Sequence, residues 1–405
     1  MKKICLVVVG LYINLLSCFS QSTMLTDSAL YKSRKLKPEE INLVSSYYHQ
    51  DGDHSAVTGG DGTQLLSDYA TDIDLTLTKY NQHQHKINWY IDLSVDYYTS
   101  ASSDKIDPST ISSASAHDLH IAPAVTRTVT NEQKGTAFEL TGSIGTESNY
   151  FSTGFGIGFT KKSKDKSRAF TAKTTAYIDQ VKLILPIELR DSATGGLPGY
   201  HFHDYPWSHR NTFSTSFTLS QIISTRWQLL FAMDIAYQQG YLSTPYHRIY
   251  FDTDSETVEH LPSERFKIPV SVRSSYFLRD KFIIRSFYRF YHDDWGLNAH
   301  TFDNEFVCKI TPFFSVSPFY RYYIQNAIRY FAPDKAHLPT DIYYSSNYDL
   351  SAFHSSFFGT GFRIAPINGI LGHKHWTMLE LRYGHYIRSN DFHSDVLSMN
   401  LRFNP

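Results

Sequence analysis

INWYIDLSVDY, residues 87–97, alternates between apolar and polar side chains, with Tyr90 as the exception. Successive side chains of a β-strand point to opposite faces, so this period of two predicts a strand with one apolar and one polar face. Strands of soluble proteins average about five or six residues, whereas a tilted strand that crosses a bilayer needs about 9 to 11. The length of this segment therefore favours a membrane-crossing strand.

The same alternation recurs through almost the whole chain and predicts about sixteen strands, within a range of about 14 to 18. The segments begin near residues 42, 67, 86, 118, 135, 149, 168, 210, 225, 267, 281, 299, 313, 349, 376 and 393. Their connections alternate between long and short, which is typical of barrels with long outer loops and short periplasmic turns. Unpaired backbone groups are costly in hydrocarbon, so such a sheet has to close on itself. The predicted fold is all-β: a single closed antiparallel transmembrane β-barrel.

A soluble, secreted β-sandwich or propeller is the alternative that shares this alternation. Its strands would be shorter and its turns more uniform. Aromatic residues make up 15% of the chain, mainly 29 Tyr and 28 Phe, which suits the aromatic belts of a membrane protein. We therefore expect outer-membrane lipid as the partner of the barrel's outer face.

Charge and hydropathy exclude two other classes. The formal net charge is −1, so the chain has no basic excess with which to hold nucleic acid. After residue 20, no apolar run approaches the ~18 residues that a membrane-spanning helix needs. Neither a nucleic-acid partner nor a helical membrane protein is expected.

The N-terminus has the pattern of a secretion signal. Lys2 and Lys3 precede an apolar run, and small residues follow it, so we expect a signal peptide over residues 1–20 with cleavage before Gln21. The alternative is a bacterial lipobox that places a lipid on Cys18. Residues 21–40 are then a periplasmic segment, and residues 41–405 form the barrel in the outer membrane of a Gram-negative bacterium.

The last predicted strand carries an apolar face made of Leu397, Met399, Leu401 and Phe403. This face is similar to the terminal aromatic strand by which bacterial barrels are recognised for insertion. We expect the barrel-insertion machinery to be a partner through this strand.

Several segments share features with a known family: residues 288–296 (YRFYHDDWG) with His300 and Thr301, and residues 45–51, 111–116, 318–323 and 348–351. They resemble the domain-of-unknown-function family 3570 of bacterial outer-membrane-type proteins. The resemblance implies a closed barrel and a bacterial source. It also suggests exported envelope proteins, redox-linked ones among them, as partners, and it assigns no activity to any residue.

If the apolar face of each strand meets lipid, the polar face lines the lumen. The residues then expected in the lumen are charged: Asp72, Asp74, Asp92, Asp96, Arg273, Arg285, Arg289, Arg321, Arg382 and Arg402. In a barrel of sixteen strands, the acids of the second and third strands would lie opposite arginines of the tenth and eleventh. Such charges would tune which solutes pass through a water-filled pore. Alternatively, they pair with neighbouring strands or an inward loop in a closed lumen.

Histidine pairs raise the question of a metal site. Among three His-x-His pairs, the best candidate is His201 and His203 with His209 nearby, because this spacing puts both rings of an extended pair on one face. These residues fall in a connection without a Cys or a carboxylate cluster. Solvated loop histidines are the simpler interpretation, and we predict neither metal nor cofactor.

The family-like motif forms an expected outer loop that contains His292, Asp293, Asp294, Trp295, Gly296 and His300. Paired carboxylates can act as acid and base or can bind calcium. The alternative is structural: Asp294 caps a tight turn at Gly296, and Trp295 anchors in the membrane interface. Gly154, Gly156 and Gly158 lie at strand period with no helix after them, which favours close packing over a nucleotide loop.

These patterns predict a general class of function but no particular substrate. We expect a porin-like barrel for passive passage of small polar solutes, with no enzymatic activity. The first alternative is a non-conducting barrel that binds exported envelope proteins. The second is an outer-membrane lipid hydrolase, although neither His354 with Ser356 nor Ser214 with Ser216 has the spacing that would single out a nucleophile.

Overall fold

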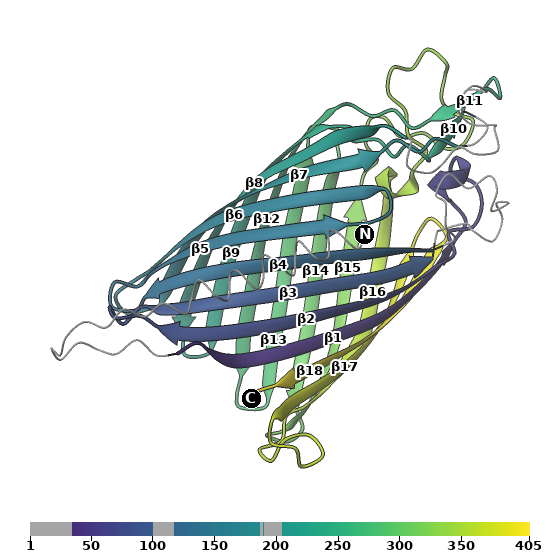
Figure 1. Ribbon diagram of the computed structural model, residues 1–405. Helices are drawn as coiled ribbons and strands as arrows, with labels where there is room; N and C mark the ends of the chain where they lie inside the picture. Colours follow the sequence, from purple (N-terminus) through teal and green to yellow (C-terminus); the bar gives the residue numbers. More distant parts are fainter. Residues whose placement is uncertain (1–34, 100–116, 187–188, 190–204) are drawn as a thin grey trace.

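The structure is a computed structural model that describes residues 35–99, 117–186, 189 and 205–405. Within these residues, sixteen strands form one closed antiparallel barrel, in the order β1-β18-β17-β16-β15-β14-β13-β12-β9-β8-β7-β6-β5-β4-β3-β2 (Figure 1). The barrel strands are β1 Lys37–Gly52, β2 Leu66–Tyr80, β3 Lys86–Thr99, β4 His117–Asn131, β5 Thr136–Thr146, β6 Tyr150–Lys162, β7 Arg168–Lys182, β8 Trp207–Ser224, β9 Trp227–Gly240, β12 Glu264–Leu278, β13 Phe282–Asp293, β14 Asn298–Lys309, β15 Phe314–Gln325, β16 Phe353–Ile364, β17 Trp376–Arg388 and β18 Phe392–Phe403. The prediction of a closed barrel of about sixteen strands is confirmed.

Closure joins the first strand to the last. β1 pairs with β18 from Ile41 opposite Phe403 to Gly52 opposite Phe392. Every barrel strand therefore has a partner on both sides, so none leaves an open row of N–H and C=O groups to hydrocarbon.

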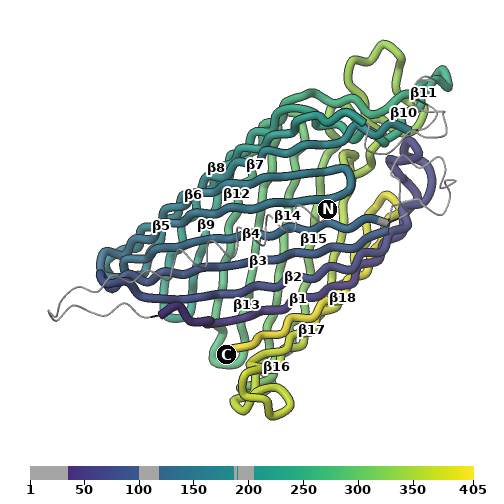
Figure 2. Tube along the Cα trace, in the orientation of Figure 1, coloured from purple at the N-terminus to yellow at the C-terminus, as the bar shows by residue number. Residues whose placement is uncertain are grey.

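The two ends of the barrel differ in the length of their connections (Figure 2). At the end where β1 begins and β18 ends, called the turn end below, most connections are short, such as 225–226 and 279–281. At the opposite end, the loop end, several are long, including 53–65, 241–263 and 326–352. The predicted alternation of connection lengths is therefore confirmed.

Large apolar side chains cover the outer face. Phe155 is 64% exposed, Ile157 is 55% exposed and Leu397 is 54% exposed, and similar residues follow around the barrel. No second layer of the described chain packs on them, so the soluble sandwich is wrong. Apolar patches of this extent are not stable in water, and the belt therefore faces lipid. The described residues contain no helix long and apolar enough to span a membrane.

Three long connections interlock at the loop end, and we call residues 53–65, 241–263 and 326–352 the cap. It contains a small hairpin of β10 Arg248–Tyr250 and β11 Glu256–Val258 and two 3-10 turns, η1 Ala56–Thr58 and η4 Tyr348–Leu350. Isolated bridges join the second segment to the third at Phe251 with His337 and at His260 with Tyr344. His54 stacks on Tyr348 at 3.8 Å between ring centroids and so joins the first segment to the third.

Some boundaries differ from those expected. β1 begins at Lys37, so residues 37–40 belong to the barrel and not to the segment expected in the periplasm. β16 begins at Phe353 and not near residue 349, because η4 occupies Tyr348–Leu350. The signal peptide, Cys18 and the family-like segment 111–116 lie outside the described residues.

Candidate functional site

The pairing register places all ten charged residues expected in the lumen on one common face of the sheet. Asp74 pairs with Asp92 between β2 and β3, and Arg273 pairs with Phe287 between β12 and β13. Around the barrel, this face is opposite to the one that carries Phe155 and Leu397. The structure thus brings the ten residues to the lumen side, on β2, β3, β12, β13, β15, β17 and β18.

The acids on β2 and β3 form a cluster, which we call the acidic wall: Asp68, Asp72, Asp74, Asp92 and Asp96. The Tyr90 hydroxyl donates to Asp74, and His120 Nδ1 lies 3.3 Å from Asp96 Oδ2. Among the described residues, no Lys or Arg forms an ion pair with a member of this wall. The wall therefore presents net negative charge to the lumen.

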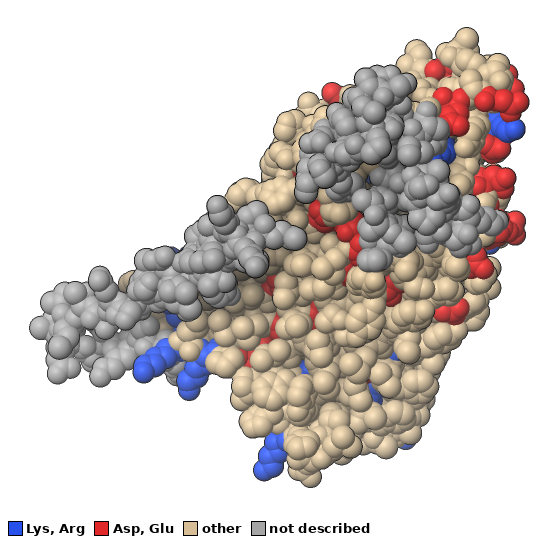
Figure 3. Space-filling view, turned by 45° about the vertical axis from the view of Figure 1, so that its right-hand side comes forward, with Lys and Arg blue, Asp and Glu red and all other residues tan. Residues whose placement is uncertain are grey.

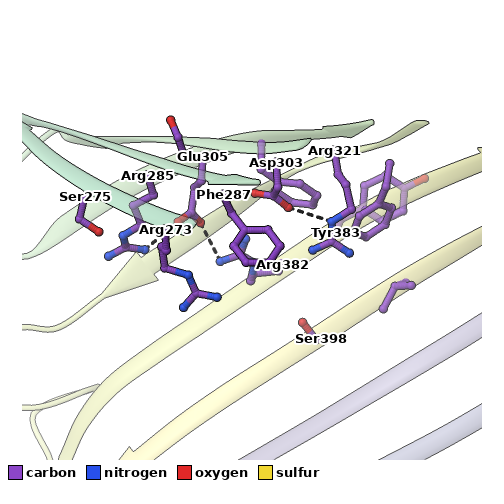
Figure 4. Close-up of a pocket in the computed structure, with 15 residues that line it drawn as sticks. Arg273, Ser275, Arg285, Phe287, Asp303, Glu305, Arg321, Arg382, Tyr383 and Ser398 are labelled. Atoms are coloured by element: carbon purple, nitrogen blue, oxygen red, sulfur yellow. Dashed lines mark hydrogen bonds and ion pairs between the residues drawn. The ribbon is translucent and has the colours of Figure 1, made fainter. Parts of the chain in front are cut away.

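Arginines dominate the opposite side of the lumen, and we call Arg273, Arg285, Arg289, Arg321 and Arg382 the arginine wall. Glu305 Oε2 accepts from Arg285 at 2.7 Å, and Glu305 Oε1 lies 2.9 Å from Arg382 (Figure 4). Asp303 Oδ2 accepts from Arg321 Nε at 2.9 Å. Glu380 Oε1 on β17 also accepts from Arg382 Nη1 at 3.2 Å. Among the described residues, three carboxylates thus offset five arginines, which leaves the wall net positive.

Asp303 and Glu305 were not anticipated from the sequence. On β14 they alternate with the outward residues Phe302 and Phe306, so the same period of two could have found them. Arg402 lies apart from the arginine wall, where its Nε contacts Asn42 at 3.2 Å and Glu40 at 3.5 Å. Some of the lumen charges therefore pair with residues on neighbouring strands, as the closed-lumen alternative expected.

Two members of the arginine wall have no carboxylate partner among the described residues, Arg273 and Arg289. Arg273 lies over the Phe287 ring at 5.4 Å. Both side chains are exposed toward the lumen. They are the charges of this wall that are free to meet a solute.

Two adjoining cavities follow the arginine wall. The first has a volume of about 580 Å³, and its lining includes Arg273, Arg285, Arg321 and Arg382 with Phe287, Phe319 and Phe357 (Figure 4). The second, of about 610 Å³, lies nearer the loop end and is lined by Arg289, Tyr48, Tyr323 and Tyr386 among others. They share Arg321, Phe357 and Val396, so they form one continuous space.

The cap reaches over the second cavity. Gln64 and Asp349, both from cap segments, contribute to its lining. Arg388 fixes this arrangement, because it donates to Asp349 Oδ1 at 2.7 Å and to the Tyr348 carbonyl at 3.1 Å. Its guanidinium also lies 3.9 Å from the centre of the Phe353 ring. The cap is therefore attached to the rim of the lumen.

The family-like motif is a structural turn. His292 and Asp293 end β13 and His300 lies in β14, so the connection itself is only 294–297 and not a longer outer loop. Trp295 is 3% exposed and packs with Leu261 and Leu297 under the cap, not in the membrane interface. Its neighbour Gly296 has a φ of 92°, which an L side chain rarely adopts.

Asp293 and Asp294 have different partners. Asp293 is 1% exposed and accepts from Arg265 Nη2 at 2.5 Å, while its Oδ1 caps the turn at the Leu297 N–H. Asp294 accepts from the Phe266 N–H at 3.0 Å. Capping thus belongs mainly to Asp293, not to Asp294 as the structural interpretation expected, and neither residue lines the two cavities described above.

The proposed histidine pair lies outside the described residues, since 201 and 203 are both within 190–204. His209 lies in β8, where its carbonyl accepts from the Tyr241 N–H at 2.8 Å. Within the described ranges, no group of three or more His, Cys, Asp or Glu side chains is placed to hold a metal ion.

Charge is also unequal along the barrel axis (Figure 3). In Figure 3, acidic side chains gather around the loop end, and basic ones lie at the turn end. The acids in or beside the described loop-end connections include Asp51, Asp53, Asp61, Asp252, Asp254, Asp334, Asp341, Asp349 and Asp391. The bases at or beside the turns include Lys134, Lys161, Lys162, Lys164, Lys166, Arg226, Arg279, Lys281, Lys309 and Lys374. The two mouths therefore carry opposite charge.

The lipid-facing belt and the charged lumen together define a transmembrane β-barrel. The chain belongs to the family described as protein of unknown function (DUF3570), whose model matches residues 123–370. No curated protein gives a significant match to the chain.

Solved barrels resemble the chain in fold. A BenF-like porin from Pseudomonas fluorescens Pf-5 is 9% identical, with 91% of this chain and 99% of that one covered and a TM-score of 0.42. A bacterial polysaccharide outer membrane secretin is 8% identical, with 90% and 98% covered and a TM-score of 0.43. The outer membrane protein OpdK from Pseudomonas aeruginosa is 7% identical, with 90% and 97% covered and a TM-score of 0.40. Likeness at this level brings no substrate or mechanism to this chain.

Proposed function

We propose that the chain forms a water-filled pore in the outer membrane of a Gram-negative bacterium, through which small polar solutes pass passively. The observation that carries the proposal is the exposure of charged side chains that point inward. The side chain of Arg285 is 49% exposed and that of Arg321 is 48% exposed, although both lie on the lumen face. A lumen packed with protein would bury them. Short turns at the end where β1 begins and β18 ends support a periplasmic turn end and an outer loop end.

The two charged walls support selectivity among solutes. β2 and β3 lie about half-way around the strand order from β12 and β13, so Arg273, Arg285 and Arg289 of the arginine wall lie across the lumen from the acidic wall. Opposite charges across a pore create a transverse field, which orients dipolar solutes and discriminates by charge.

Conductance in planar bilayers tests the proposal. We expect the purified barrel to give steps of current, and we expect a variant with Lys at positions 72, 74, 92 and 96 to shift the reversal potential in a salt gradient toward anion selectivity. A matched control is Arg127→Glu, a charge reversal on the outer face, where Arg127 lies 5.7 Å from the Trp89 ring centre. This control should leave the reversal potential unchanged. A barrel that passes no ions in any condition contradicts the proposal.

A second candidate is a non-conducting barrel that binds exported envelope proteins. The attachment of the cap over the second cavity by Arg388 favours it, because a fixed cap would narrow the pore. Absence of conductance together with capture of a defined envelope protein would support this candidate over the pore.

We propose no catalytic activity, and the residues considered for a lipid hydrolase have other contacts. On the outer face, Ser356 Oγ lies 3.0 Å from the Tyr320 hydroxyl, and the His354 ring packs near Tyr322 with 6.3 Å between centroids. Labelling of the folded barrel by a serine-directed probe would be evidence for the hydrolase instead.

A further inference from the structure

We infer that the arginine wall holds a binding site for small carboxylates with a flat apolar body, centred on Arg273, Phe287 and Arg289. This inference rests on the proposed function, since such solutes would enter through the pore. It deepens that proposal by naming a solute class.

The carboxylate would meet Arg273 and Arg289, the two guanidinium groups of this wall that have no carboxylate partner among the described residues. Arg289 follows Phe287 by two residues on β13, and Arg273 is the direct partner of Phe287 across the β12–β13 pair. All three side chains therefore project from one face, and residues two apart on a strand are about 7 Å from each other. A planar guanidinium donates two parallel hydrogen bonds to a carboxylate, which favours this anion over a spherical one.

The apolar body would meet aromatic rings that are already held in place by arginine. Arg321 lies 5.7 Å from the Phe357 ring centre, and Arg382 lies 5.1 Å from that of Phe319. These contacts fix the rings along the same wall that carries the free guanidinium groups. A flat ligand can stack on a ring at this wall while its carboxylate reaches Arg273 or Arg289.

Charge and volume both match such a ligand. Among the described residues, Glu305, Asp303 and Glu380 already pair with Arg285, Arg321 and Arg382, so the remaining positive charge is that of Arg273 and Arg289. Arg273 and Phe287 line the first cavity, of about 580 Å³, and Arg289 lines the adjoining one, of about 610 Å³. Each volume lies within the range of roughly 300 to 1,000 Å³ that small-molecule sites occupy.

The test measures binding to the purified barrel in detergent by isothermal titration calorimetry, with phenylacetate as the probe. Phenylacetamide has the same ring without the charge, and acetate has the charge without the ring. We expect saturable binding of phenylacetate, and binding of each comparison compound weaker by about tenfold or more. Equal binding of all three compounds would overturn the inference.

Variants locate the site. Arg273→Gln and Arg289→Gln should each weaken phenylacetate binding about tenfold, because each loses a charge-assisted hydrogen bond. Arg402→Gln is the matched control, since Arg402 faces the lumen outside the cavity and is already paired. It should bind as the unmodified barrel does. Arg273→Lys keeps the charge without the planar fork, so it should lose part of the affinity and serves if Arg273→Gln fails to fold.

Calorimetry in detergent does not depend on conduction, so the two proposals can fail separately. A conducting barrel whose phenylacetate affinity is unchanged in Arg273→Gln and Arg289→Gln overturns the inference alone. A barrel that binds phenylacetate through these arginines but passes no ions overturns the pore alone.

Discussion

Asp293 ends β13 with its carboxylate enclosed by protein, between Arg265 and the turn that leads to β14. Besides Arg265 and the Leu297 N–H, it accepts from the Tyr291 hydroxyl at 2.9 Å. The Arg265 guanidinium also lies 4.2 Å from the Trp295 ring centre. One residue therefore joins two strands, a turn and the apolar cluster beneath the cap.

Removing the charge of Asp293 should destabilise the loop end. In Asp293→Asn, Arg265 keeps its charge in a site where its side chain is only 13% exposed, and breaking a buried pair in this way costs about 3 to 5 kcal/mol. We expect a fall of this order in the free energy of unfolding, measured by urea unfolding from lipid vesicles. Asp294→Asn, which perturbs one backbone hydrogen bond, should lose about 1 kcal/mol or less. Equal losses in the two variants would contradict this account.

The sequence pattern alone did not distinguish the roles of Asp293 and Asp294. An Asp-Asp-Trp-Gly motif at a strand end is compatible with a turn, a metal site or an acid-base pair, and its local spacing does not choose among them. The decisive partner, Arg265, lies 28 positions away on β12. Burial of Trp295 likewise depends on Leu261 and Ile328, which the chain brings together only when the cap folds.

At the scale of elements, β6 shows why glycine is repeated on a strand. Gly154 lies on the lumen face beside Tyr177 of β7, and a Cβ added there would clash with Ser143 Oγ and stand 2.7 Å from Tyr177 Cε1. The ring thus lies over the glycine, as aromatic residues often cover glycine in sheets. The expectation of close packing in place of a nucleotide loop agrees with this geometry.

A side chain at Gly154 should therefore displace the tyrosine. Gly154→Ala is expected to lower the free energy of unfolding by about 1 to 3 kcal/mol, the usual cost of overpacking. Gly142→Ala on β5 is the matched control, because a Cβ there has nothing within 4 Å, and it should be neutral or slightly stabilising. Thermal unfolding in detergent measures both, and a neutral Gly154→Ala would mean that the ring moves at no cost.

The cap has its own ionisable centre in Glu259, whose side chain is 2% exposed. Burial raises the pKa of Glu259, but His247, whose Nδ1 lies 3.7 Å from Glu259 Oε2, and the hydrogen bonds from Ser345 and the Thr244 N–H outweigh burial and leave this pKa below its ordinary value. Ser345 Oγ donates to Glu259 Oε1 at 2.5 Å and so ties segment 326–352 to segment 241–263.

Acid should loosen this contact. Because the folded-state pKa of Glu259 is lowered, its stabilising contribution is complete above the unfolded value of about 4.3 and is lost as the pH falls through the folded value. Spin labels at positions 253 and 335, in a Cys308→Ser background, should give a narrow distance distribution at pH 7 and a broad one near pH 3. In Glu259→Gln the distribution should be broad at both. An unchanged distribution at low pH would contradict the role of Glu259.

The barrel strands were predictable from sequence and the cap was not, for one physical reason. Each strand is selected by its own alternation, since lipid on one side and water on the other act on every residue separately. The cap is held by contacts between segments far apart in the chain, such as His260 Nδ1 with the Ile342 carbonyl at 2.8 Å. The lumen face followed from the same alternation, but the pairing of Arg321 with Asp303 depends on which strands are neighbours.

At the scale of the whole molecule, the outer and inner faces should respond oppositely to charge. Phe155 lies near the middle of β6 and faces lipid, so Phe155→Arg should cost about 2 to 4 kcal/mol of stability in the bilayer. Ala124→Arg places the same charge on the lumen face of β4, opposite Asp92, and should be tolerated. Urea unfolding from vesicles compares the two, and equal costs would mean that the assignment of faces is wrong.

The two mouths of the barrel carry opposite charge, although the formal net charge of the chain is only −1. In the proposed pore, mobile cations would collect at the acidic loop end and anions at the basic turn end, so ion concentrations inside would depend on the direction of the applied voltage. We therefore expect rectification: equal and opposite voltages should drive unequal currents. Its bent current–voltage curve would reveal which way round each inserted molecule sits.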